Sequence, residues 1–201
     1  MSETQEVLRA PESIIGLFDG LRVLSLDIET TGLKDDDEII ELGVIEFVNG
    51  VETRRGSTLF GGKPCPEEVI RRHGITDDQR AGKLTFAQKS EHVYEYFQKA
   101  ILLGHNIVKF DLPFIDRVLK ANGFFLGKKK GYIWAIDTLL LSRQYLGASS
   151  NKLENLCKMY KLEHGGHRGL GDAINSWQIL CIILEKLKCQ NIKGVLKKVS
   201  L

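Results

Sequence analysis

The sequence predicts one α/β domain in which a mixed five-stranded sheet is flanked by helices. Three meandering strands come first, between residues 22 and 60, and strands alternate with helices after residue 85. This order is typical of a mixed sheet covered by helices, because each face of a sheet must bury its apolar side chains against another layer. A chain of 201 residues with a hydrophobic fraction of 43% is long enough for one such core, and no internal repeat indicates a second domain.

The first part of the chain predicts a lead-in followed by a meander. Residues 1–20 have weak periodicity and are expected to form a loose N-terminal lead-in. Residues 22–28 predict a first strand, and their largely apolar character favours burial in the middle of the sheet. Residues 38–48 and 51–60 predict two further strands, and the Asn-Gly pair between them is a strong hairpin signal.

Helices and shorter strands are predicted after the meander. Thr85 and Gln88 have the spacing of a capping box, and Pro113 lies in the first turn of a later helix that ends before Gly123. The expected elements are a short helix near 67–72, a helix at 85–99, a strand at 101–104, a helix from residue 111, a strand at 133–136, and helices near 138–145, 151–160 and 170–188. Residues 191–201 are expected to form a basic C-terminal tail.

Composition and charge exclude several classes of protein. The net charge of +2 does not indicate nucleic-acid binding by itself, and the basic clusters at 71–72, 128–130 and 193–198 are typical of solvated surface. The four cysteines form no CxxC pair, so a zinc site is not expected. No segment resembles a signal peptide, and no apolar stretch reaches the length of a membrane span. We therefore expect a protein of a reducing, cytoplasmic compartment with no membrane association.

Two acidic residues lie at the end of the first predicted strand. Asp27 and Glu29 belong to the segment Leu-Asp-Ile-Glu-Thr-Thr-Gly, and alternation along a strand places both on the same side. Neighbouring carboxylates at the end of a buried strand repel each other and lose hydration, which favours a bound cation. The alternative is that the strand has already ended and both residues are exposed in a turn.

Asp111 and Asp172 each begin a predicted helix. Asp111 follows the strand at 101–104, and its purely structural interpretation is an ordinary N-cap. Asp172 precedes the apolar stripe of the last helix by one position, so its carboxylate is expected to lean inward. A favourable charge near a helix N-terminus is its structural alternative. The four acidic residues together are harder to explain in these terms than each one alone.

Three motifs together resemble those of DEDDh-type 3′→5′ exonucleases. The motifs are Asp27-x-Glu29-Thr-Thr-Gly, then His105-Asn106 with Phe110-Asp111, and finally His167 followed by Asp172-Ala173. This superfamily includes the proofreading subunit of bacterial DNA polymerase III, ribonuclease T and oligoribonuclease. The resemblance extends from about residue 22 to residue 188, and it implies a ribonuclease H-like fold for an exonuclease domain at residues 21–190.

The resemblance also implies roles for individual residues. Two divalent ions, Mg²⁺ or Mn²⁺, would be held by Asp27, Glu29, Asp111 and Asp172. Carboxylate ligands suit such hard cations. His167 would act as the general base, since the reference pKa of histidine, about 6.5, lies near working pH. The residues matched to those that contact the terminal nucleotide are Thr30, Glu68 and His73. The implied activity is release of nucleoside monophosphates from DNA or RNA, so the expected partner is a nucleic acid with a free 3′ end.

The third motif departs from the family, which often has alanine and an acidic residue where this chain has Gly169 and Gly171. With Gly165 and Gly166 they predict a mobile segment, in which His167 is mobile or turned away when no substrate is bound. A tight glycine-rich turn is the alternative. The sequence has no clear clamp-binding motif of the kind found on proofreading subunits, so association with a DNA polymerase has no support from it.

Other functions compete with this interpretation. The Gly61-Gly62-Lys63 segment is not a Walker phosphate loop, because the chain has Ser57 and Pro64 where that loop needs Gly and then Ser or Thr. An inactive nuclease-fold adaptor would be indicated by loss of an acidic ligand, and all four are present. An RNA-trimming or oligonucleotide exonuclease stays open, because DNA and RNA share the scissile phosphodiester.

Overall fold

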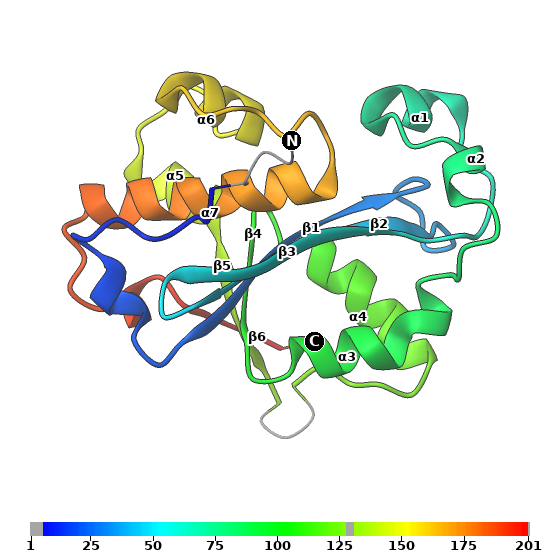
Figure 1. The fold of residues 1–201 in the computed structure, drawn as a ribbon, viewed down its shortest axis with the longest axis horizontal. Coiled ribbons are helices and arrows are strands. Elements are labelled where there is room, and N and C mark those ends of the chain that lie inside the picture. Colours follow the sequence, from blue (N-terminus) through cyan, green and yellow to red (C-terminus); the bar gives the residue numbers. More distant parts are fainter. Residues whose placement is uncertain (1–5, 128–130, 201) are drawn as a thin grey trace.

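A computed structural model of the chain describes residues 6–127 and 131–200, and the basic run at 128–130 lies outside the described residues. One mixed sheet runs through the molecule in the order β3-β2-β1-β4-β5-β6 (Figure 1). The strands are β1 Arg22–Thr30, β2 Ile39–Val48, β3 Val51–Leu59, β4 Ile101–Gly104, β5 Ile133–Asp137 and β6 Lys197–Val199. The predicted fold class is confirmed, although the described sheet has six strands instead of the expected five.

Helices cover both faces of this sheet. They are α1 Glu67–His73, α2 Asp77–Arg80, α3 Ser90–Phe97, α4 Asp111–Ala121, α5 Thr138–Tyr145, α6 Leu153–Tyr160 and α7 Gly169–Lys186. Short 3-10 turns add η1 Ile15–Phe18, η2 Ala87–Lys89 and η3 Ile192–Gly194. In Figure 1, α7 crosses one face of the sheet with α5 and α6 beyond it, while α3 and α4 cover the other face.

The central strand β1 contributes alternately to two hydrophobic cores. Val23 packs in the core that contains α7, and the Ser25 hydroxyl on the same side donates to the Ala173 carbonyl at 2.6 Å. Leu24 and Leu26 point the other way, into the core under α3 and α4. Because alternation continues along the strand, positions 27 and 29 lie on the α7 side. The end of β1 therefore brings its acidic residues toward the start of α7.

The meander forms as predicted. β1 pairs with β2 and β2 with β3, both antiparallel, and β4 pairs parallel with β1 on one side and with β5 on the other. The Asn-Gly turn between β2 and β3 has positive φ angles of 52° at Asn49 and 74° at Gly50. These angles are the ones that a two-residue hairpin of right-handed twist requires.

Both ends of the described chain are more ordered than expected. The loose lead-in is a wrong expectation for residues 6–20, because Ala10, Ile14 and Phe18 are buried in the α7 core and residue 9 bridges to β3. The basic tail is also partly wrong. Residues 197–199 form β6, which pairs antiparallel with β5 and is the additional strand of the sheet. Short pieces like these have too little periodicity to be recognised from sequence.

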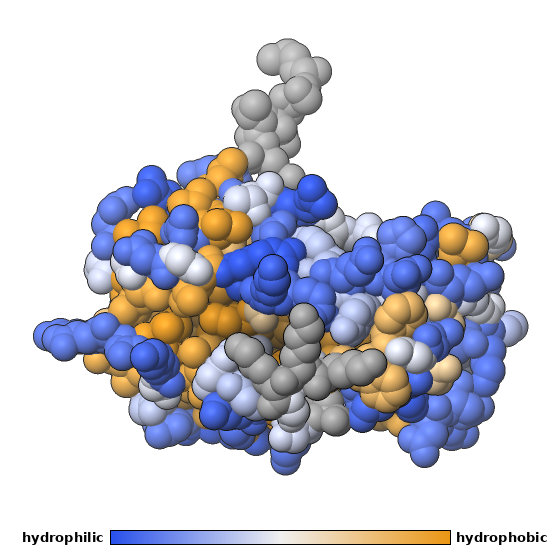
Figure 2. Space-filling view, turned by 90° about the horizontal axis from the view of Figure 1, so that it is seen from below, coloured by the Kyte–Doolittle hydropathy of each residue, from blue (hydrophilic) through white to orange (hydrophobic). Residues whose placement is uncertain are grey.

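The outer surface is mostly hydrophilic on the side seen from below in Figure 2. Hydrophobic side chains gather on the left of that view, the side where η1 and the carboxyl end of α7 lie in Figure 1. None of the described helices is long and apolar enough to cross a membrane.

Candidate active site

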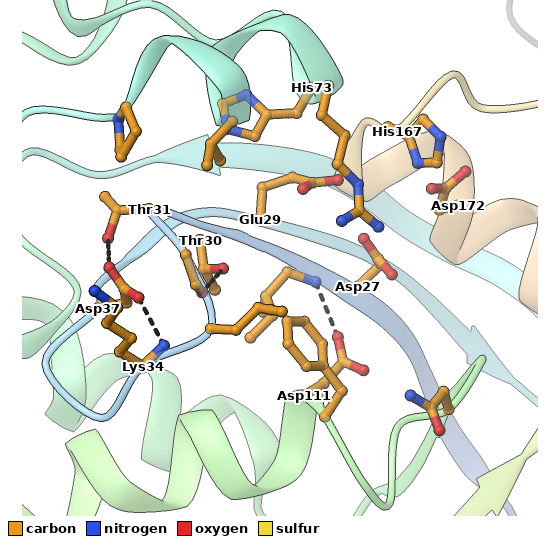
Figure 3. A pocket seen from close by; sticks show the side chains of 18 of the residues that line it. Asp27, Glu29, Thr30, Thr31, Lys34, Asp37, His73, Asp111, His167 and Asp172 are labelled. Atoms are coloured by element: carbon orange, nitrogen blue, oxygen red, sulfur yellow. Dashed lines mark hydrogen bonds between the residues drawn. The ribbon is translucent and has the colours of Figure 1, made fainter.

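All eight residues that the sequence predicts for the site line one cleft. The cleft has a volume of about 750 Å³ and lies where the end of β1, α1, the start of α4 and the start of α7 meet. Figure 3 shows the acidic side chains turned toward a common space, with His167 above Asp172 and the Thr31–Asp37 loop at the opposite end. The predicted residues in its lining are Asp27, Glu29, Thr30, Glu68, His73, Asp111, His167 and Asp172.

Asp27 and Glu29 are strand residues. β1 continues to Thr30, past both carboxylates, and Asp27 and Glu29 are paired with Gly43 and Glu41 of β2. The alternative that both are exposed in a turn is therefore wrong. A register shift between Glu29 and Thr30 ends the regular pairing, and the Thr30 hydroxyl then donates to the Gly32 carbonyl at 2.6 Å.

Asp111 reaches the strand from the opposite core. It is the first residue of α4, but no side chain caps this helix, so the ordinary N-cap interpretation is wrong. Instead its Oδ1 accepts the backbone N–H of Ile28 at 3.1 Å, between the two acidic residues of β1. Its side chain is buried, with the residue only 2% exposed. This bond fixes the fourth carboxylate beside Asp27.

Asp172 lies in the first turn of α7 and is 7% exposed. Its Oδ1 atom is buried and has no hydrogen-bond partner among the described residues. Buried polar atoms nearly always have such a partner, so the orphaned oxygen indicates a missing ligand. The inward lean expected from the helix pattern is confirmed.

These carboxylates fit a divalent cation. One carboxylate oxygen from each of Asp27, Glu29 and Asp172 lies within 4.8 Å of the others. Mg²⁺ and Mn²⁺ prefer oxygen ligands of this kind. A cation between them would partner the orphaned Asp172 oxygen and balance the like charges. Asp111 lies outside this tight group but lines the same cleft.

Crowding of the carboxylates changes their acidity. Burial raises the pKa of Asp27 well above its usual range, and the charges of Asp111 and Glu29 add to the rise. Burial and then Asp172 raise the pKa of Glu29 to about 8, and burial raises the pKa of Asp111 to about 7. The pKa of Asp172 is also raised, mainly by burial. Without a cation, protons would occupy part of the cluster at neutral pH.

An ion pair between the exposed Arg168 and the buried Glu41 holds the chain next to His167. Arg168 Nη2 donates to Glu41 Oε1 at 2.9 Å, and the Gly169 N–H donates to Oε2 of the same carboxylate at 3.0 Å. Glu41 is fully buried on β2 and also accepts from the Ser57 hydroxyl. Since Arg168 directly follows His167, the pair fixes one side of the segment that carries the histidine.

Glycines of the third motif allow close packing. A Cβ atom at Gly169 would lie 2.8 Å from the Gly43 nitrogen, and one at Gly171 would lie 2.4 Å from the Gly165 Cα. Only residues without a side chain permit these approaches. His167 has a positive φ of 55° and lines the cleft (Figure 3). His167 is therefore not turned away in this structure, and the contacts favour the tight-turn alternative. The mobility of the segment stays a prediction.

The residues matched to terminal-nucleotide contacts differ in what they can offer. Glu68 is exposed on α1, so its carboxylate is free to meet a ligand. His73 is 3% exposed, and burial lowers its pKa. Its Nδ1 accepts the Ile75 N–H at 2.9 Å, and its Nε2 lies 3.7 Å from Cys65 Sγ. Both nitrogens are thus engaged within the domain, and the neutral ring forms part of the cleft wall.

The neighbouring polar residues hold the structure around the cleft together. His105 Nδ1 lies 2.9 Å from Thr138 Oγ1, and its Nε2 lies 2.9 Å from the Asn151 carbonyl. Asp137 caps α5 through its side chain and also accepts the Asn106 N–H at 3.1 Å. These bonds tie the loop before α4 to the start of α5.

With this geometry in place, comparison with known proteins decides the family. The model of the exonuclease family, RNase_T, matches residues 24–180. The chain belongs to the exonuclease family.

Two relatives of the chain carry the same name. The chain is 32% identical to DNA polymerase III subunit epsilon of Buchnera aphidicola subsp. Baizongia pistaciae over an alignment of 167 residues, and this alignment covers 79% of this chain and 67% of that protein. It is 30% identical over 168 residues to the subunit of the same name from Escherichia coli (strain K12), covering 79% and 68%. The predicted resemblance to DEDDh-type 3′→5′ exonucleases is confirmed.

Solved structures of exonuclease I share the fold of this exonuclease. One superposes with a TM-score of 0.73 at 19% identity, covering 82% of this chain and 41% of that chain. E. coli exonuclease I in complex with a dT13 oligonucleotide gives 0.72 at 18% identity, covering 83% and 41%. The chain thus spans about two fifths of the length of these exonuclease I chains.

The sequence did not reveal three residues beside the exonuclease site. Glu41 and Arg168 are two of them, and a glutamate inside the apolar β2 segment was the available signal of a buried partner. The third is His164, whose Nε2 lies 4.0 Å from Asp172 Oδ1. The Gly166 N–H donates to its Nδ1, so the proton is on Nε2, facing the carboxylate.

Proposed function

We propose that this chain is a metal-dependent 3′→5′ exonuclease that releases nucleoside monophosphates from DNA or RNA. The observation that carries the proposal is the meeting of Asp27, Glu29 and Asp172 oxygens within 4.8 Å, in a cleft that Asp111 and His167 also line. Such a cluster is unfavourable without a cation, which supports a catalytic purpose for it.

The carboxylates would hold two ions, Mg²⁺ or Mn²⁺. When bound, such ions activate a water molecule and stabilise negative charge on the scissile phosphodiester. Asp27 and Glu29 would hold the ions from β1, Asp172 from α7 and Asp111 from α4. The Ile28 N–H keeps the Asp111 carboxylate in place. Asp172 has the greatest need of a partner, because its buried Oδ1 has none among the described residues.

His167 would be the general base in this proposal. In its neutral form it accepts a proton from the attacking water while the water oxygen bonds to phosphorus. The bond between phosphorus and the 3′-oxygen of the preceding nucleotide breaks, and that oxygen takes up a proton. The Glu41–Arg168 ion pair supports this role because it anchors the residue that follows His167.

The substrate would be a nucleic acid with a free 3′ end. Its terminal nucleotide would lie between the Thr30 backbone and α1, where Glu68 is exposed to the cleft. Solved structures of E. coli exonuclease I with dT13 and dA16 oligonucleotides share this fold, which supports a single-stranded end as the substrate to test first. The presence of all four acidic ligands in one cleft supports an active enzyme over an inactive adaptor.

Polarity and substrate class can be tested together. Linear 5′-labelled DNA and RNA strands should shorten by one nucleotide at a time with Mg²⁺ or Mn²⁺, and a 3′-phosphate should block the reaction. Preference for RNA over DNA would select the RNA-trimming alternative. Cutting of a circular single strand at a comparable rate would overturn the exonuclease polarity and leave only an endonuclease.

A further inference from the structure

Arg72 is a cation that faces the acidic cluster. It lies in the last turn of α1 and lines the cleft, as do Glu68 and His73 of the same helix. Asp27 and Glu29 of β1 and Asp172 of α7 line the same cleft. The Arg72 guanidinium therefore shares this space with carboxylates from both elements.

This guanidinium has no structural partner in the described part of the chain. Three other arginines near the site are paired: Arg80 with Asp77, Arg117 with Asp35, and Arg168 with Glu41. Arg72 is exposed and belongs to none of the ion pairs of residues 6–127 and 131–200. Its basic neighbour Arg71 is also exposed but does not line the cleft. The two residues, alike in the sequence, thus differ in position.

The backbone that carries Arg72 is firmly anchored. The next residue, His73, is buried, and its ring accepts the Ile75 N–H. Ile70 packs on the small core of Ile40 and Ile75, and Gly74 ends the helix in the left-handed conformation. A fixed backbone with an unpaired, flexible side chain is the arrangement expected for a group that meets a ligand.

We infer that Arg72 binds the phosphate of the terminal nucleotide, both before and after that phosphate is released from the strand. This inference rests on the proposed function. A guanidinium presents parallel N–H donors that match phosphate oxygens, and charge-assisted bonds of this kind are the strong ones. Two divalent ions balance four carboxylates, so the negative charge of the phosphate needs a further cation. Hydrolysis increases that need, because a monoester carries about −1.5 to −2 charges at pH 7.

Product binding tests this directly and needs no cleavage. Calorimetry with Mg²⁺ would compare deoxyadenosine 5′-monophosphate with deoxyadenosine, for the parent and for Arg72→Gln, Arg72→Lys and Arg71→Gln. We expect Arg72→Gln to weaken nucleotide binding by about 10- to 100-fold and to leave nucleoside binding unchanged. Arg72→Lys should recover part of the loss, and Arg71→Gln, the matched control on the same helix, should stay within about twofold of the parent.

Each other outcome has a definite meaning. Equal nucleotide affinities for Arg72→Gln and Arg71→Gln would overturn the inference, as would equal losses for nucleotide and nucleoside. A parent that does not distinguish the nucleotide from the nucleoside would overturn it too. If the parent binds the nucleotide through Arg72 but degrades no strand, the phosphate site stands and the proposed exonuclease activity fails.

Discussion

Replacing Glu29 with glutamine should stabilise the metal-free protein at pH 8. The substitution keeps the size of the side chain and removes its charge. Burial, followed by the charges of Asp172 and Glu41, raises the pKa of Glu29 from 4.5 to about 8. A carboxyl group whose pKa is raised by folding stabilises the folded state fully below pH 4.5, and this stability is lost as the pH rises through about 8. The glutamine variant cannot lose it.

The size of the effect follows from the same shift. A change in pKa from 4.5 to about 8 corresponds to at most about 5 kcal/mol, at about 1.36 kcal/mol per pKa unit. Glu29 is only partly buried, so solvent screening reduces this limit. We expect the variant to gain about 1–3 kcal/mol of unfolding free energy at pH 8 and much less at pH 5.

Urea unfolding in EDTA at the two pH values measures this gain. Glu68→Gln is the matched control, because Glu68 lines the same cleft but is exposed on α1. The unfolding free energy of this variant should equal that of the parent at both pH values. Added Mg²⁺ should stabilise the parent more than Glu29→Gln, since a ligand stabilises the state that binds it. A Glu29→Gln variant that is no more stable than the parent at pH 8 in EDTA would refute the unfavourable burial and repulsion of the Glu29 charge.

Three further predictions concern the neighbourhood of the cluster. His167→Ala should lower turnover by about 10²- to 10⁴-fold while Mg²⁺ binding, measured by calorimetry, is kept; an unchanged pH–rate profile would assign the base elsewhere. Gly43→Ala places a Cβ atom 1.9 Å from the Gly169 carbonyl carbon and should cost about 1–3 kcal/mol or more of unfolding free energy. Its control is Gly56→Ala, where a Cβ atom meets nothing within 4 Å, and equal losses in urea unfolding would contradict the close packing. Glu41→Gln should cost about 1–3 kcal/mol through weakened bonds to Arg168, and parental stability would show that the pair contributes nothing.

Local periodicity predicted much of the fold and the outline of the site. Alternation along one strand was enough to place Asp27 and Glu29 on the same side, because strand geometry alone fixes that relation. The inward lean of Asp172 followed from its position beside the apolar stripe of α7. The resemblance to DEDDh-type exonucleases grouped these residues with Asp111, and all four line one cleft. The bond of Asp111 to the Ile28 N–H could not be predicted, because it depends on how α4 docks against β1.

Contacts between segments that are distant in the sequence explain what the sequence analysis missed or misinterpreted. Glu41 and Arg168 are 127 positions apart, so nothing local connects them. Gly169 was interpreted as a source of mobility because glycine frees the backbone, whereas here it lets the start of α7 approach the backbone of Gly43 in β2. The same limit applies to Phe18, which is buried against Trp177 with ring centroids 4.9 Å apart despite the weak pattern around it.

The most direct test of the central claim compares the parent with Asp27→Ala on 5′-labelled single-stranded DNA and RNA. Circular dichroism would first establish that both proteins are folded, as expected because the substitution removes a repelled carboxylate. With Mg²⁺ or Mn²⁺ the parent should release nucleotides one at a time from the 3′ end, and Asp27→Ala should release none. EDTA should stop the parent as completely as the substitution does. Degradation by Asp27→Ala at the parental rate would contradict a metal-dependent exonuclease built on this acidic cluster.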